Sequence, residues 1–207
     1  MNEYDQNFWE GRWSQALREH GDRVAQRPPN AHLTAEVGDL SPGRALDAGC
    51  GHGSDTLWLA ARGWQVTAVD FAPTALAYAR STAEAMGPDV AERIDWVEAD
   101  LATWTPQRDE YGLVVCLYVH VAGSVEEMAQ RMATGVAQGG TLFLVGHRPI
   151  DPVTGAATAA AGQVQVSVDA ALAALDPDRW ELVVAEDRPR PMAGTGVDAV
   201  IRARRRS

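Results

Sequence analysis

The sequence predicts an α/β fold, a doubly wound and mostly parallel sheet of seven strands with the last strand antiparallel, and three observations support it. Short apolar runs alternate with helical patterns between residues 44 and 148, a rhythm typical of an open parallel sheet. The continuous apolar run YGLVVCLYV (111–119) suits a central parallel strand that is buried on both faces. The turn-rich segment RPRPMAGTG leaves no room for a helix between the last two strand-like segments, so we expect these to pair as an antiparallel hairpin.

Periodicity and helix start and stop signals place the individual elements. The first segment reads as a helix because Phe8, Trp9 and Trp13 follow helical spacing, and the clearest break comes at RPPN (27–30). The expected strands lie at 44–48, 64–70, 94–100, 111–119, 140–146, 180–187 and 196–204. The expected helices of the sheet lie at 54–63, 73–86, 125–137 and 169–175.

Composition narrows the class of protein. A length of 207 residues suits one domain, and 46% hydrophobic with 22% charged residues is ordinary for a soluble protein. The opening residues show neither a basic start nor an apolar run, and no uncharged apolar stretch is long enough to cross a bilayer. Cys50 and Cys116 form neither a disulfide framework nor a metal pattern. We therefore expect a cytoplasmic protein.

The charge balance argues against a nucleic-acid partner. The formal net charge is −10, whereas proteins that bind nucleic acid neutralise phosphates with a basic patch. The one basic cluster, in the tail IRARRRS, is more typical of a solvated terminus than of a binding site. A small, uncharged or cationic partner fits this charge better.

The segment LDAGCGHGSDTLWLA (46–60) is the first candidate ligand site. It places Gly49, Gly51 and Gly53 between the first strand and the first helix of the sheet, at the strand end where doubly wound sheets bind ligands. Glycine allows positive φ and a close approach of a ligand to the backbone. A tight turn without a ligand is the plainer alternative. The spacing is G-x-G-x-G, which departs from the G-x-G-x-x-G of dinucleotide-binding proteins.

Acidic residues mark the ends of the first three strands. Asp47 precedes the glycines, Asp70 ends VTAVD, and Asp100 follows the third strand in VEADLATW. A carboxylate at the end of the second strand is placed to accept hydrogen bonds from both hydroxyls of a ribose, and Phe71 beside it is placed to pack on an adenine ring. Together with the glycine spacing, this pattern resembles the class I S-adenosylmethionine (SAM) methyltransferases, whose fold is Rossmann-like.

The resemblance implies a set of cofactor-binding residues. Asp47 and the three glycines would hold the methionine end and the ribose of SAM, and Asp70 would bind the ribose. Asp100 and Leu101 would frame the adenine. The full set that we expect to contact the cofactor is Asp47, Gly49, Cys50, Gly51, Gly53, Asp55, Asp70, Phe71, Asp100, Leu101 and Leu117.

Three residues of the loop keep alternative interpretations. Asp55 either touches the cofactor or is favoured by the dipole in the first turn of its helix. Cys50 reads as a small residue that fits the loop rather than as a nucleophile. His52 either has a direct role or is one of the polar residues that vary at this position among similar proteins.

The N-terminal segment resembles the lead-in of small bacterial methyltransferases of the tellurite-resistance and thiopurine group. FWEGRW followed by RPPNAHL carries this resemblance, although Ala25 and Gln26 stand where the group has a tryptophan. It implies one methyltransferase domain over 1–207. Residues 1–40 would form a helical lid, and 41–207 the core, with a possible cap at 147–168. Trp9 and Trp13 would then line the substrate pocket, or simply pack the helix.

The acceptor side of the site is less well marked. His120, just beyond the fourth strand, is the best candidate for a general base, since histidine titrates near neutral pH. The alternative for His120 is a histidine that packs or hydrogen-bonds in the loop. Tyr118 is a candidate for lining the same pocket, and His147 and Arg148, after the fifth strand, also lie at the carboxyl edge of the sheet as candidates for substrate binding. Arg148 either holds an acidic group of the substrate or forms a structural ion pair. The five histidines show no metal-ligand spacing, so we expect no metal.

The functional hypothesis is a SAM-dependent methyltransferase that acts on a heteroatom (O, N or S) of a small molecule. Methyltransferases of nucleic-acid bases often carry an Asn/Asp-Pro-Pro-aromatic segment after the fourth strand, but here that position reads LYVHVAG (117–123). Two alternatives stay open, namely a non-catalytic SAM-binding or regulatory protein of the same fold and, with less support, an NAD-type oxidoreductase. The acceptor, its reacting atom and the oligomeric state are open as well.

Overall fold

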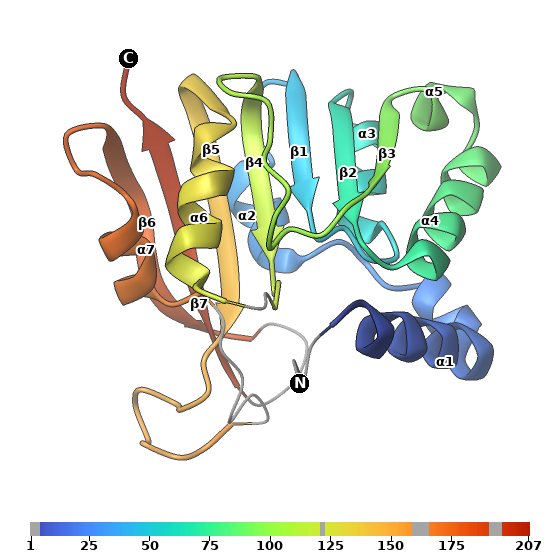
Figure 1. Ribbon diagram of the computed structural model, residues 1–207, viewed down its shortest axis with the longest axis horizontal. Helices are drawn as coiled ribbons and strands as arrows, with labels where there is room; N and C mark the ends of the chain where they lie inside the picture. The colour runs from blue at the N-terminus through green and yellow to red at the C-terminus, as the bar shows by residue number, and fades with distance from the viewer. Residues whose placement is uncertain (1–4, 121–122, 159–165, 191–195) are drawn as a thin grey trace. The chain divides into compact units, whose positions relative to one another are not determined.

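The computed structural model describes residues 5–120, 123–158, 166–190 and 196–207, and the chain divides into two compact units, Met1–Trp104 and Thr105–Ser207. The described residues contain a seven-stranded sheet whose order is β3-β2-β1 in the first unit and β4-β5-β7-β6 in the second (Figure 1). The α/β fold that the sequence predicts, mostly parallel with its last strand antiparallel, is confirmed.

Over its described residues, 5–104, the first unit is a parallel three-stranded arrangement with five helices. Its register pairs Asp47 with Ala68 and Asp70 with Glu98, so the acidic strand ends lie along one edge. Its strands are β1 (Arg44–Ala48), β2 (Gln65–Asp70) and β3 (Ile94–Glu98). Its helices are α1 (Gln6–Ala25), α2 (Ala31–Val37), α3 (Ser54–Ala61), α4 (Pro73–Met86) and α5 (Pro88–Ala91).

The second unit contains the antiparallel end of the sheet. Strand β5 runs parallel to β4, while β7 lies between β5 and β6 and is antiparallel to both. Its elements are β4 (Tyr111–Leu117), α6 (Val125–Thr134), β5 (Val136–His147), α7 (Val168–Ala174), β6 (Trp180–Pro189) and β7 (Val197–Arg205). Helices α6 and α7 contact each other, and α7 also contacts β6 and β7. The core includes the fully buried Phe143, Met128 and Ile201.

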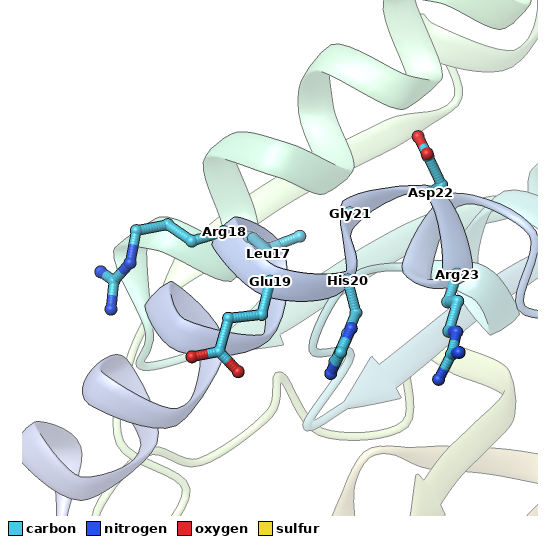
Figure 2. A pocket seen from close by; sticks show the side chains of 7 residues that line it. All are labelled: Leu17, Arg18, Glu19, His20, Gly21, Asp22 and Arg23. Carbon is cyan, nitrogen blue, oxygen red and sulfur yellow. The ribbon is translucent and has the colours of Figure 1, made fainter.

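Helix α1 is kinked. His20 has non-helical dihedral angles (φ −141°, ψ 30°) and is followed by Gly21. A depression at the kink is lined by residues 17–23, and Figure 2 shows Glu19, His20 and Arg23 pointing away from the helix on one side while Asp22 points to another. Because these polar side chains are exposed, the depression is a feature of the helix surface.

Two short helices were not predicted from the sequence. Helix α2 begins at the N-cap Asn30, whose side chain accepts hydrogen bonds from the amides of His32 and Leu33. Helix α5 has only four residues, too few for a periodic pattern. The tail is also more than a solvated terminus, since most of it belongs to β7 and Arg205 forms an ion pair with Asp109. Among the described helices, none is long and apolar enough to cross a membrane.

Candidate functional site

The glycine loop follows β1 and is fixed by backbone hydrogen bonds to β2. The amides of Gly49 and Cys50 both donate to the carbonyl of Val69, at 2.8 and 3.0 Å. The amide of Gly51 donates to Oδ2 of Asp70 at 2.8 Å. The end of β2 therefore organises the loop after β1, and both segments belong to the edge where parallel sheets bind ligands.

Gly51 and Gly53 are required by close packing as well as by conformation. Their φ angles are +53° and +85°, which side chains rarely adopt. A Cβ on Gly51 would lie 2.8 Å from Cζ2 of Trp13, and a Cβ on Gly53 would lie 2.8 Å from Cβ of Ala79. The loop is thus pressed between α1 on one side and α4 on the other.

Three carboxylates surround this loop, and burial raises the pKa of each. Asp47 accepts a hydrogen bond from the Thr56 hydroxyl at 2.5 Å, yet burial, with repulsion from Asp55, raises its pKa to about 7. Burial raises the pKa of Asp55 to about 6. Burial also raises the pKa of Asp70, whose oxygens accept from the amides of Gly51 and Ala72. Negative charge is therefore costly here without a compensating cation.

Asp55 also has a local structural contact. Its carboxylate accepts a hydrogen bond from the backbone amide of Asn30 at 2.7 Å, which ties the N-cap of α2 to the first turn of α3. A cofactor contact for Asp55 stays a prediction beside this observed role.

Cys50 and His52 lie buried in the loop. Burial raises the pKa of the Cys50 thiol well above its usual value, so the thiol stays protonated and is a poor nucleophile. Burial and the positive charge of Arg27 lower the pKa of His52 to about 4, so its imidazole is neutral at pH 7. Its Nε2 has no hydrogen-bond partner, and its ring centroid lies 5.3 Å from that of Trp13.

Helix α1 is docked on the loops that follow β1 and β2. Gln6 donates to the carbonyl of Phe71 at 2.7 Å, and the Glu10 carboxylate accepts from the amide of Thr74 at 3.1 Å and from its hydroxyl. Helix α4 has no side-chain cap of its own, since Ala72 occupies the N-cap, and Glu10 supplies that acceptor. In Figure 1, α1 lies on the side toward which the arrowheads of β1 and β2 point.

The two candidate tryptophans of α1 lie in different surroundings. Trp13 contacts the glycine loop through Gly51 and His52. Trp9 is half-buried, packs edge-on against Phe8 at 5.4 Å and lies under the Arg12 guanidinium. Of the two, Trp13 is the one that the structure brings to the loop.

The end of β3 lies beside the end of β2. The amide of Ala99 donates to the carbonyl of Asp70 at 3.0 Å. Asp100 is exposed and accepts from the amide of Ala102 at 2.8 Å, while Leu101 is buried. The three acidic strand ends of the first unit thus lie along one edge.

The remaining predicted site residues belong to the second unit. Leu117 is the last residue of β4 and is half-buried, as is His120 three residues later. Tyr118 stacks on His147 with ring centroids 4.0 Å apart. Arg148 forms an ion pair with Asp187 at 3.3 Å, which is one of the alternatives that the sequence left open.

Sequence reasoning missed several residues that hold these groups in place. Asp198 is fully buried and bonds both Tyr118 and His147, and Arg190 bonds Asp198. The sequence did carry a signal for Asp198, which is the single acidic residue in the otherwise apolar run VDAVI (197–201). Nothing in the sequence signalled that Glu10 would cap a helix more than sixty residues away. Among the described residues, no group of three or more His, Cys, Asp and Glu could hold a metal ion.

Comparison with known proteins agrees with this geometry. A methyltransferase-domain family model matches residues 45–140. The chain is 38% identical over 137 residues to the trans-aconitate 2-methyltransferase of Streptomyces avermitilis, covering 62% of this chain and 48% of that protein. It therefore spans about half the length of that relative.

Two further proteins extend the match beyond the glycine loop. A probable thiol methyltransferase of Arabidopsis thaliana is 32% identical over 158 residues, covering 75% of this chain and 67% of that protein. The solved N-methyltransferase NodS of Bradyrhizobium japonicum, in complex with S-adenosylhomocysteine, aligns with a TM-score of 0.69 at 16% identity, over 98% of this chain and all of that one. The structural match supports the fold, the sequence match supports the family, and together with the glycine loop they place this chain in the class I SAM-dependent methyltransferases.

Proposed function

We propose that the protein transfers a methyl group from SAM to a heteroatom of a small molecule. The observation that carries the proposal is the acidic glycine loop, in which Asp47, Asp55 and Asp70 are buried at a raised pKa. SAM carries a positively charged sulfonium, and a cation beside these carboxylates offsets the cost of their burial. The pyrophosphate of a dinucleotide would add negative charge at the same loop, which disfavours the oxidoreductase alternative.

The proposed cofactor residues follow from their places in the first unit. Asp70 lies at the end of β2, where each of its oxygens already accepts one backbone amide and retains capacity for a ribose hydroxyl. The glycines leave room for the adenosyl-methionine backbone, and Asp100 with Leu101 lies at the end of β3 for the adenine. Leu117 in the second unit stays a prediction. The chain itself contributes binding, orientation and exclusion of water; SAM supplies the electrophilic methyl group.

The N-terminal segment is proposed to cover this site. Gln6, Glu10 and Trp13 contact the loops after β1 and β2, which supports the lid over residues 1–40. The cap over 147–168 falls partly outside the described residues. The cytoplasmic location and the absence of a nucleic-acid partner also stay predictions.

The names of two relatives support a small molecule as the methyl acceptor of this chain. These two are named for a carboxylic acid and for a thiol, so oxygen and sulfur are the acceptor atoms that these names support for this chain.

The test is calorimetric titration with SAM and S-adenosylhomocysteine, with NAD as the control ligand. We expect micromolar binding of both adenosyl compounds and no binding of NAD. Asp70→Asn should weaken S-adenosylhomocysteine binding by about 10- to 100-fold, because hydrogen bonds to a charged group are worth roughly 1.5–3 kcal/mol. The exposed Asp95→Asn on β3 is the matched control. Binding of NAD, or wild-type affinity in Asp70→Asn, would contradict the proposal.

A further inference from the structure

His52 carries a buried polar atom for which the described residues offer no partner. It lies between two glycines of the loop, and its relative exposure is 9%. Its Nε2 is shielded from water and makes no hydrogen bond with any described residue. Such an atom is costly, because it has lost its water and gained no partner in exchange. An atom of this kind in a ligand-binding loop indicates a ligand group that completes the hydrogen bond.

Helix α1 covers the imidazole of His52. The ring centroid of Trp13 lies 5.3 Å from that of His52, with the two planes tilted by 34°. Trp13 also lies against the neighbouring Gly51, where an added Cβ would be 2.8 Å from Cζ2 of the indole. The imidazole thus lies where α1 meets the glycine loop, and both segments belong to the first unit.

The segment that follows α1 brings a positive charge to this part of the loop. The backbone amide of Asn30 donates to the Asp55 carboxylate at 2.7 Å, and Asp55 lies in the first turn of α3, three residues after His52. This hydrogen bond anchors the segment that begins at Arg27. Together with burial, the charge of the exposed Arg27 lowers the pKa of His52 to about 4.

The loop therefore presents two kinds of electrostatic surroundings. Burial, with repulsion from Asp55, raises the pKa of Asp47 to about 7, so the surroundings of Asp47 favour a cation. The positive charge that acts on His52 keeps its imidazole neutral and favours an anion there. A ligand that carries both a positive and a negative group fits this loop better than a ligand that carries only one of them.

A carboxylate is the negative group that suits His52 and Arg27. A neutral imidazole with its proton on Nε2 donates one hydrogen bond, a guanidinium donates several, and a carboxylate only accepts. Hydrogen bonds to a charged group are also stronger than those between neutral groups. An ammonium group would be repelled by Arg27, and a phosphate would bring more negative charge to a loop that already buries three carboxylates.

We propose that His52 and Arg27 form a carboxylate-binding subsite beside the glycine loop. The inference rests on the proposed methyltransferase function. Two ligands of that reaction present a carboxylate, namely SAM at its methionine end and an acidic acceptor of the kind for which one relative is named. The same two donors suit either carboxylate, so the experiments have one arm for each.

The first experiment compares SAM with decarboxylated SAM, which keeps the sulfonium and the ammonium group and lacks only the carboxylate. By calorimetry, the wild type should bind SAM about 10- to 100-fold more tightly than decarboxylated SAM, the range expected of a hydrogen bond to a charged group. His52→Phe keeps a ring against Trp13 but loses both nitrogens. It should bind SAM more weakly by most of that factor and bind decarboxylated SAM as the wild type does.

Two further substitutions of His52 separate the hydrogen bond from the packing of the ring. The side-chain amide nitrogen of His52→Gln reaches the position of Nε2, so this variant should keep the preference for SAM. His52→Asn places its amide near the position of Nδ1 instead and should lose the preference. Both variants shorten or flatten the side chain in a similar way, so a difference between them reports the donor at Nε2.

Arg27→Gln tests the charge. It should reduce the preference for SAM by about two- to fivefold, as expected for an exposed ion pair. Arg23→Gln, which removes an equally exposed arginine of α1, is the matched control and should leave the preference unchanged.

The second experiment tests an acidic acceptor as the source of the carboxylate. Protein saturated with S-adenosylhomocysteine is titrated with trans-aconitate, and its uncharged trimethyl ester is the control ligand. If an acceptor occupies the subsite, the wild type should bind trans-aconitate and His52→Phe should weaken this binding by about tenfold or more, while both SAM compounds bind as in the wild type.

A selective loss for SAM, or for trans-aconitate, supports the subsite and identifies the carboxylate that it holds. Wild-type affinity of His52→Phe for SAM, decarboxylated SAM and trans-aconitate would overturn the inference. Equal weakening of SAM and decarboxylated SAM in both His52→Phe and His52→Asn would overturn it as well. A wild-type protein that binds no adenosyl compound refutes the proposed function itself, whereas one that binds S-adenosylhomocysteine but shows no dependence on a carboxylate refutes only the subsite.

Discussion

Replacing Asp47 with Asn should make the protein more stable while it weakens cofactor binding. Asp47 is buried and its pKa is raised from 3.8 to about 7, first by burial and then by repulsion from Asp55. Between these two pH values the folded protein keeps the proton and the unfolded chain loses it, so stability falls as the pH rises. A shift of about 3 pH units corresponds to roughly 4 kcal/mol, present in full above pH 7.

Asn removes this penalty because it carries no charge, and its carbonyl oxygen still accepts the hydrogen bond from Thr56. We expect Asp47→Asn to unfold with a free energy higher by up to about 4 kcal/mol at pH 8, and by less than about 1 kcal/mol at pH 4. The assay is urea unfolding followed by circular dichroism at both pH values, with exposed Asp95→Asn as the control.

The same variant should separate the two adenosyl ligands. In the proposed site the sulfonium of SAM offsets the burial of the Asp47 carboxylate, so the loss of this charge should lower the affinity for the cationic SAM more than for the neutral S-adenosylhomocysteine. A variant that is equally stable or less stable at pH 8, or one that gains stability equally at pH 4, would refute the electrostatic account of the loop.

Three other substitutions test how the loop is held. Glu10→Gln should lower the free energy of unfolding by about 1 kcal/mol, because it weakens the cap that Glu10 provides for α4 at Thr74. Amide hydrogen exchange in α1 should also become faster, and unchanged slow exchange there would contradict the role of Glu10 in docking α1. Gly53→Ala should lower the free energy of unfolding by more than about 1 kcal/mol. Adding Ala79→Gly to this variant should recover part of that lost stability, because the new Cβ at position 53 would meet Ala79. If nothing is recovered, the positive φ of residue 53 alone is responsible. His52→Gln should reduce the loss of stability on acidification from pH 6.5 toward pH 4, because the folded state holds the pKa of His52 down to about 4 while the unfolded state takes up the proton; an unchanged acid profile would count against this.

The sequence predicted the sheet well because its strands are short apolar runs with strong boundaries. The reversed strand was readable from RPRPMAGTG, and β6 and β7 are indeed antiparallel. The sequence could not show that β7 also pairs with β5, because the order of strands in a sheet depends on contacts between residues that are distant in the sequence. Strand β5 begins at Val136, four residues before the prediction, because its first residues, VAQG, carry no strand pattern.

The cofactor side of the site was more readable than the acceptor side. Backbone conformation dictates the glycines, and their spacing is visible in the sequence; Gly51 and Gly53 also meet neighbours that exclude a side chain. The polar partners of Tyr118 and His147 are Asp198 on β7 and Arg190, which follows β6. No local pattern links residues that far apart, so the sequence could not group them, and the assignment of a base to His120 stays a prediction.

The features that cost stability in this protein gather at strand ends in both units. In the first unit, three carboxylates have raised pKa values and the Nε2 of His52 lies buried without a partner. In the second, Tyr118 is held at positive φ over a buried carboxylate. A fold selected for stability alone would replace such groups, since an uncharged side chain at position 47 would avoid the burial cost. Within each unit these strand ends are the positions at which sheets of this kind bind ligands, and the raised pKa values in the first unit are explained if a cationic cofactor supplies the charge that these carboxylates lack.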